Sequence, residues 1–141
     1  MTIIILKFFH FLAIFVGGGI GIGGAVVQSA HIKAGEPPRP HVAKALRTLG
    51  LLGLGAIAVL WLTGMVLALS IYGGLAINGA FHVKLTGATI MVAASAYANF
   101  HIHDKASEQQ PPNMKVMKTM TSLTRLGLVL ALGGAAAAFS G

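Results

Sequence analysis

The stretch Ala80–Leu85, with the sequence Ala-Phe-His-Val-Lys-Leu, opens a long apolar segment and decides how the chain is interpreted. It places the imidazole of His82 and the ammonium of Lys84 two residues apart at the start of a segment long enough to cross a membrane. A lysine in such a segment must reach the membrane surface, pair with an anion or take part in chemistry. The stretch therefore predicts a functional site near one membrane face.

A second stretch, Phe8–Leu12, has the sequence Phe-Phe-His-Phe-Leu and opens the first apolar segment. His31 follows His10 by 21 residues, and His103 follows His82 by the same interval. Along an α-helix, 21 residues rise about 31 Å, which is close to the thickness of the hydrocarbon core. The sequence therefore predicts two helices that each carry a histidine near both membrane faces.

Small residues occupy every seventh position between these histidines: Gly17 and Gly24 in the first segment, Thr89 and Ala96 in the third. A smooth groove of this kind accepts a flat ring, and haem b takes neutral imidazoles as axial ligands. We therefore expect haem b to be bound by His10 and His82. Gly17 would lie beside the ring, and Lys84 would meet a propionate or act as a catalytic cation.

The second pair of histidines leaves two interpretations open. His31, with either His103 or His101, would bind a second haem and complete an electron path across the membrane, or these would be loop histidines beside lipid headgroups. We therefore expect one haem, and a second haem is the alternative.

Composition limits the chain to one membrane domain, residues 1–141. Its 141 residues are 55% hydrophobic and 9% charged, with mean hydropathy +0.81. The absence of cysteine excludes disulfides, thiolate haem ligation and Cys-ligated iron–sulfur or zinc sites. The net charge of +7 does not indicate nucleic acid, because the basic residues lie in two loops beside apolar segments.

Apolar runs predict an all-α, polytopic membrane protein, a bundle of four transmembrane helices over about 3–27, 46–72, 80–100 and 120–139, the fourth being the weakest. The two long loops carry eight basic residues: Lys33, Arg39, Lys44, Arg47, Lys105, Lys115, Lys118 and Arg125. The opposite side carries only Lys7 and Lys84. This asymmetry predicts cytoplasmic loops and both termini on the non-cytoplasmic side of a bacterial-type inner membrane.

Two rival functions come from other features. Met114, Met117 and Met120 repeat every three residues, and thioethers favour Cu(I), which suggests copper handling. The glycines of 17–24 form small-xxx-small pairs that favour helix packing, which suggests a non-catalytic structural or assembly subunit of a larger membrane complex.

The motifs Lys7–His10, Phe81–Leu85 and Trp61–Gly64, with the 21-residue step to His31, resemble those of the HemJ-type protoporphyrinogen IX oxidases and related four-helix membrane proteins. The resemblance extends over nearly the whole chain but is thin outside these motifs. It implies a four-helix bundle, haem b and roles for His10 and Lys84.

Two departures from the family pattern affect the reaction more than the cofactor. Where the family has a Pro-Arg pair late in the first helix, this chain has Ala25-Val26. Where the family has a cluster of acidic and basic residues before the second helix, this chain has residues 42–47. We therefore expect a haem b-binding membrane protein with a redox or electron-transfer role. Its partners would be the lipid bilayer, a porphyrinogen or quinone, and further copies or subunits of a complex.

Overall fold

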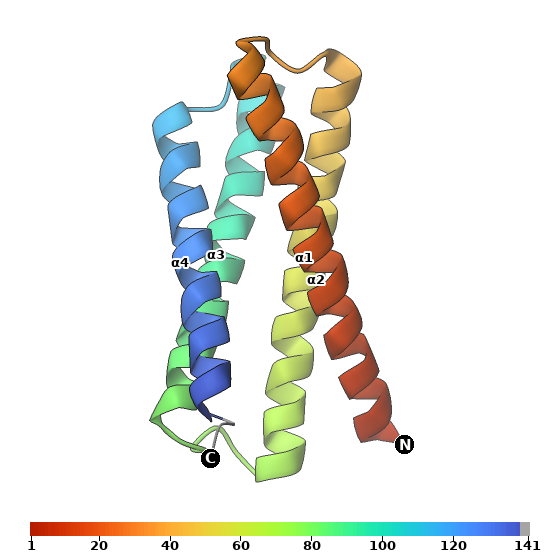
Figure 1. The fold of residues 1–141 in the computed structure, drawn as a ribbon, viewed down its shortest axis with the longest axis vertical. Coiled ribbons are helices and arrows are strands. Elements are labelled where there is room, and N and C mark those ends of the chain that lie inside the picture. Colours follow the sequence, from red (N-terminus) through yellow and green to blue (C-terminus); the bar gives the residue numbers. More distant parts are fainter. Residues whose placement is uncertain (139–141) are drawn as a thin grey trace.

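The computed structural model describes residues 1–138, which form four α-helices. These are α1 (Thr2–Ala34), α2 (Pro40–Tyr72), α3 (Gly79–Ser107) and α4 (Met114–Ala138). Figure 1 shows two helical hairpins side by side, with the α1–α2 and α3–α4 loops at one end. The N-terminus, the α2–α3 turn and the end of α4 lie at the opposite end. The all-α prediction is confirmed.

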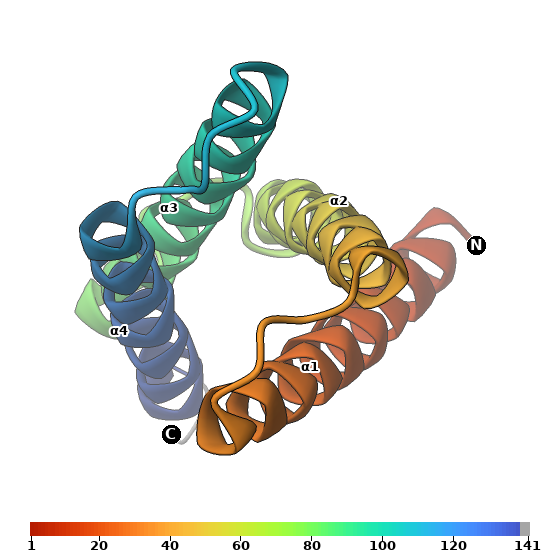
Figure 2. The same cartoon turned by 90° about the horizontal axis from the view of Figure 1, so that it is seen from above.

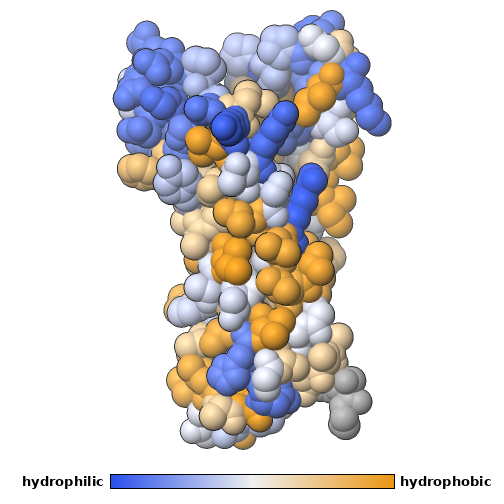
Figure 3. Space-filling view, turned by 90° about the vertical axis from the view of Figure 1, so that its left-hand side faces the viewer, coloured by the Kyte–Doolittle hydropathy of each residue, from blue (hydrophilic) through white to orange (hydrophobic). Residues whose placement is uncertain are grey.

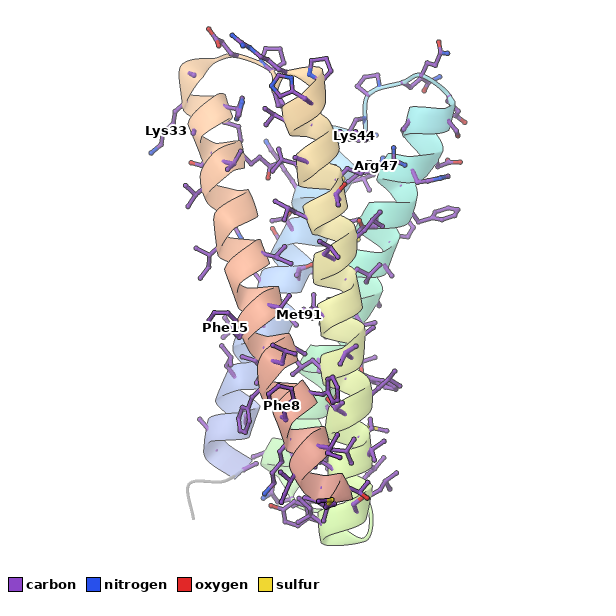
Figure 4. All side chains as sticks on the ribbon, turned by 90° about the vertical axis from the view of Figure 1, so that its right-hand side faces the viewer. Phe8, Phe15, Lys33, Lys44, Arg47 and Met91 are labelled. Atoms are coloured by element: carbon purple, nitrogen blue, oxygen red, sulfur yellow. The ribbon has the colours of Figure 1, made fainter. Side chains whose placement is uncertain are left out.

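The helices are longer than the predicted spans at the end that carries the two loops. α1 and α2 contain 33 residues each, which corresponds to about 50 Å of helix against roughly 30 Å of hydrocarbon. α1 ends only at Gly35, whose φ of 67° is left-handed, and Pro40 begins α2. Figure 4 shows Lys33 near this end of the molecule, on the part of α1 that extends past the predicted span.

Three of the four helices, α1, α2 and α4, are long and apolar enough to cross a membrane. α3 is the helix that does not meet this criterion, although the sequence marked the fourth segment as the weakest. The reason is the number of polar side chains along α3, which include His82, Lys84, Thr86, Thr89, Ser95 and Asn99.

Contacts between the helices follow the order of the chain. α1 packs against α2, α2 against α3, and α3 against α4, with the α3–α4 contact the most extensive. Within residues 1–138, no Cα atom of α1 lies within 8 Å of a Cα atom of α3 or α4. Figure 2 shows this arrangement from above, with each hairpin as a separate pair. The helices therefore form an open array, and the side of α1 that faces away from α2 has no helix covering it.

Glycines bring the backbones of α3 and α4 together. A Cβ atom added at Gly87 would lie 2.6 Å from both the amide nitrogen of Ala131 and the carbonyl oxygen of Gly127. An added Cβ at Gly134 would meet the backbone of Lys84. Because neither backbone can move aside cheaply, only glycine fits these positions, as in other close helix pairs in membranes.

The glycines of α1 are packed very differently. Gly17 faces α2, where an added Cβ would lie 3.5 Å from that of Ala56. The other five glycines of 17–24 have open space around their α-carbons: Gly18, Gly19, Gly21, Gly23 and Gly24. The packing that the sequence predicted for this run is therefore not made within the described part of the chain, apart from the contact of Gly17.

We expect Gly87→Ala to destabilise the protein, because the new methyl group overlaps the backbone of α4. Overpacking of this kind costs about 1–3 kcal/mol. The matched control is Gly21→Ala, where an added methyl meets no neighbour and alanine is the better helix former by roughly 1 kcal/mol. Reversible unfolding in mixed micelles measures both, and a Gly87→Ala variant as stable as the wild type would contradict the close approach.

Candidate functional site

A small cavity lies near the end of the molecule that carries the N-terminus. Its volume is about 110 Å³, and it is lined by residues of α1, α2 and α3: His10, Gly64, Leu67, Ala68, Tyr72, Phe81 and Lys84. Two of the predicted site residues, His10 and Lys84, are thus brought together by the fold although 74 positions separate them in the sequence.

The imidazole of His10 is oriented by a hydroxyl group of α2. His10 Nδ1 lies 2.9 Å from Oγ1 of Thr63, and that hydroxyl donates its hydrogen to the carbonyl oxygen of Val59 at 2.7 Å. Since a threonine hydroxyl has one hydrogen, we assign the hydrogen of this pair to Nδ1 of His10. The neutral imidazole then carries its lone pair on Nε2, the nitrogen that is left to bind a ligand.

Gly64 allows His10 to lie directly against α2. A Cβ atom added at Gly64 would be 3.3 Å from Cε1 of His10, which is tighter than most such contacts. Ala68, one turn further along α2, also lines the cavity and is 3% exposed. Small residues on α2 therefore make the space in which the imidazole sits.

Lys84 is held in place by its surroundings on α3 and α4. Its ammonium lies 5.7 Å from the ring centroid of Phe81, which is 4% exposed. Asn78 caps α3 by accepting a hydrogen bond from the Phe81 amide at 2.8 Å. The Asn78 side chain also donates to the carbonyl of Ala138 at 3.3 Å, which ties the start of α3 to the end of α4. Lys84 is partly buried and lines the same cavity as His10.

The other predicted residues of this site lie elsewhere. His82 is exposed and does not line the cavity, because it is two residues from Lys84 and points about 200° away around the helix. Gly17 faces α2 two turns from His10 and does not line the cavity either. The cavity thus contains one imidazole and one ammonium.

The histidines at the opposite end of the molecule are not brought together. His31 donates from Nδ1 to the carbonyl of Val27 at 2.9 Å, whereas His103 is exposed on α3. Along their described lengths, no Cα atom of α1 lies within 8 Å of a Cα atom of α3. His101 accepts a hydrogen bond from the Asn113 amide at 3.1 Å and so fastens the α3–α4 loop. Among residues 1–138, no three side chains of His, Asp or Glu form a cluster that could hold a metal ion by themselves.

Two residues that position His10, Thr63 and Gly64, were not identified as site residues from the sequence. Both residues belong to the Trp61–Gly64 motif, which we used only as part of a family resemblance. The first residue of this motif also has a partner, since Trp61 donates from Nε1 to Oγ1 of Thr89 at 3.1 Å and links α2 to α3.

The cavity can be tested against the size of the expected haem. Pockets that enclose a ligand of drug size measure roughly 300–1,000 Å³, whereas this cavity measures about 110 Å³. The donor set suits a haem, with one imidazole for the iron and one cation for a carboxylate. The enclosed volume is large enough for only part of the macrocycle. The rest of the ring would have to lie between α1 and α3, where no Cα atom of one helix is within 8 Å of a Cα atom of the other.

Comparison of the chain with protein-family models, curated proteins and solved structures found no match. The resemblance to the HemJ-type oxidases therefore rests on the motifs quoted above and stays a prediction.

We expect Thr63→Val to release the imidazole of His10, because valine keeps the shape of the side chain but removes the hydroxyl partner of Nδ1. The ¹⁵N chemical shifts of the His10 ring report which nitrogen carries the hydrogen. The wild type should show the Nδ1–H form, and the Thr63→Val variant a mixture of both forms. Thr63→Ser, which restores a hydroxyl, is the control and should resemble the wild type. A ring that is Nε2–H in the wild type would overturn the assignment.

Proposed function

We propose that this chain is a haem b-binding integral membrane protein with a role in electron transfer. One observation carries the proposal: His10 Nδ1 lies 2.9 Å from the Thr63 hydroxyl, in a cavity that Lys84 also lines, and with the hydrogen on Nδ1 the lone pair of the ring would be on Nε2. A histidine that ligates a metal usually donates its other ring N–H to a protein oxygen. An ionisable residue within a membrane segment also indicates a functional site.

In this proposal each residue of the site has a separate role. His10 would hold the haem iron through Nε2, and Thr63 would hold the imidazole in the required tautomer. Lys84 would neutralise a carboxylate, either a propionate of the haem or an acid group of a bound substrate. Gly64 and Ala68 would leave room for the edge of a flat ring. A bound haem would supply one-electron chemistry at its iron.

The finer proposal concerns the donor of the electrons. A porphyrinogen carries carboxylates that Lys84 is suited to recognise, and the motif resemblance points to porphyrinogen oxidation. A quinol is the alternative donor in the bilayer. The side of the membrane proposed for the cavity carries two basic residues, Lys7 and Lys84, and only Lys84 lines the described cavity, so Lys84 would be the main cation for a carboxylate substrate there.

Orientation in the membrane is also proposed from charge. We infer that the end with the two long loops is cytoplasmic and that the cavity with His10 lies towards the opposite face, in a multi-pass inner-membrane protein. The eight basic residues of the loop end support this sidedness. Figure 3 shows the hydrophilic residues gathered at that end, above a middle region with many apolar side chains.

We expect His10→Ala to lose most of the haem, because no other imidazole lines the described cavity. His82→Ala is the matched variant, an exposed histidine on α3, and should keep both the haem and its spin state. The haem-to-protein ratio and the absorption spectrum of each purified variant measure these effects. A change to a high-spin spectrum in His82→Ala would instead support the sequence-based prediction that His10 and His82 both bind the iron. Full haem retention in His10→Ala would refute the proposed ligand.

Lys84→Met should weaken haem retention while leaving the iron spectrum largely intact, because Lys84 is proposed to bind a carboxylate and not the iron. An ammonium would have to lose its proton to bind iron, and a neutral imidazole is available in the same cavity. Lys84→Arg should rescue retention in part, since the charge persists with a different geometry. Haem loss during repeated gel filtration gives the comparison. A spin-state change in Lys84→Met would instead indicate that Lys84 is a ligand.

We expect a cysteine placed in the 73–79 turn to react with a membrane-impermeant maleimide from the non-cytoplasmic side, whereas a cysteine at Glu36 should not. The chain has no cysteine of its own, so each single substitution gives an unambiguous signal. Intact and permeabilised cells provide the comparison. Labelling of the turn only after permeabilisation would reverse the proposed orientation.

A second candidate function, an assembly subunit of a larger membrane complex, is favoured by the exposed area. The chain exposes 9304 Å² at 14.5 kDa, whereas a soluble monomer of this mass exposes roughly 6,900 Å². The uncovered glycines of α1 are part of this surface. A purified protein that is colourless, free of metal and always recovered with other subunits would support this candidate over haem binding.

Copper handling has the least support among the three alternatives. The three methionines Met114, Met117 and Met120 lie in the first two turns of α4, where Met114 is exposed and Met120 lines a groove together with Lys115. A cation beside the thioether disfavours a copper ion at that position.

A further inference from the structure

A second and wider groove lies at the opposite end of the α3–α4 hairpin from the cavity of His10. It measures about 310 Å³ and opens broadly to the outside. Tyr97 of α3 lines it together with residues of the first two turns of α4, which are Lys115, Val116, Thr119 and Met120. The groove therefore lies where the basic start of α4 meets its apolar part.

The groove has a polar side and an apolar side. Lys115 supplies the polar hydrogen-bond donor, since the hydroxyl of Thr119 already donates to the Lys115 carbonyl at 2.9 Å. Val116 and Met120 form the apolar side, and the exposed Leu123 continues it along α4. Tyr97, which is 52% exposed, stacks on His101 with the rings 7° from parallel. An aromatic ring with a polar tip is typical of the membrane–water interface.

The charge around the groove is almost entirely positive. Lys115, Lys118 and Arg125 are exposed and lie within about 80° of one another around α4. No acidic residue occurs after Glu108 in the sequence. The Glu108 carboxylate is engaged by Lys105 at 2.7 Å, and this hydrogen bond raises the pKa of Lys105. A ligand in the groove should therefore be anionic.

We propose that this groove binds the phosphate of an anionic phospholipid. The phosphate would contact Lys115, with Lys118 nearby, and an acyl chain would lie along Met120 and the apolar residues that follow. The shape supports a lipid over a free anion, because a cation and an apolar wall face the same space. Clusters of lysine and arginine beside a membrane helix attract anionic lipids. The proposal is independent of haem binding.

The test uses the full chain purified in micelles that contain either phosphatidylglycerol or phosphatidylcholine, with the bound lipid counted by native mass spectrometry. The wild type should retain phosphatidylglycerol in preference to phosphatidylcholine. Lys115→Gln should reduce that retention about fivefold, the change expected for one lysine near a membrane surface. Lys33→Gln is the matched control, an exposed lysine of the same end on α1, and should retain lipid as the wild type does. Circular dichroism establishes that each variant is folded.

Three outcomes would overturn the proposal. Equal loss in Lys115→Gln and Lys33→Gln would mean that the lipid is held by diffuse charge and not by the groove. Equal retention of phosphatidylcholine would mean that the phospholipid's net charge is not recognised. Displacement of the lipid by millimolar inorganic phosphate would make the groove a site for the free ion.

Discussion

Polar side chains in the apolar part of this chain must find partners on the protein, because hydrocarbon offers none. Among the described residues, no buried side-chain nitrogen or oxygen lacks a hydrogen bond. Thr63 and Thr89 donate to carbonyls of their own helices, and each hydroxyl then serves as the partner of a second ring, His10 for Thr63 and Trp61 for Thr89. The orientation of His10, and with it the chemistry proposed for the cavity, follows from this requirement.

Close packing of α3 on α4 provides the rest of the site's framework. Gly134 lies against the backbone of Lys84, and Gly87 lies against Gly127, so the start of α3 has a fixed position relative to α4. Among the described residues, the backbone of α1 packs closely against that of α2, and His10 and Lys84 line a cavity to which α2 also contributes. The hairpin of α3 and α4 is thus the rigid part, and the uncovered side of α1 is where a ring, a lipid or another subunit would be accommodated.

The sequence predicted the helical fold, because apolar runs are visible in a single chain, and the positions of polar residues within those runs drew attention to His10 and Lys84, which both line the cavity. It did not predict the roles of Gly87, Gly127 and Gly134, since a glycine that packs backbone against backbone looks the same in sequence as one in open space. The glycine-rich run of α1 is the most conspicuous in the sequence, yet its glycines are less closely packed than the glycines of α3 and α4. The placement of His82 away from the cavity depends on the rotation of α3, which periodicity alone does not determine.

His10 is the residue that we propose binds the iron of a haem. The most direct measurement is the absorption spectrum of the wild-type protein, purified from a membrane with a sufficient haem supply and recorded before and after reduction. We expect a Soret band that shifts on reduction, at a stoichiometry near one haem per chain. A colourless protein that stays colourless after incubation with haem would contradict it.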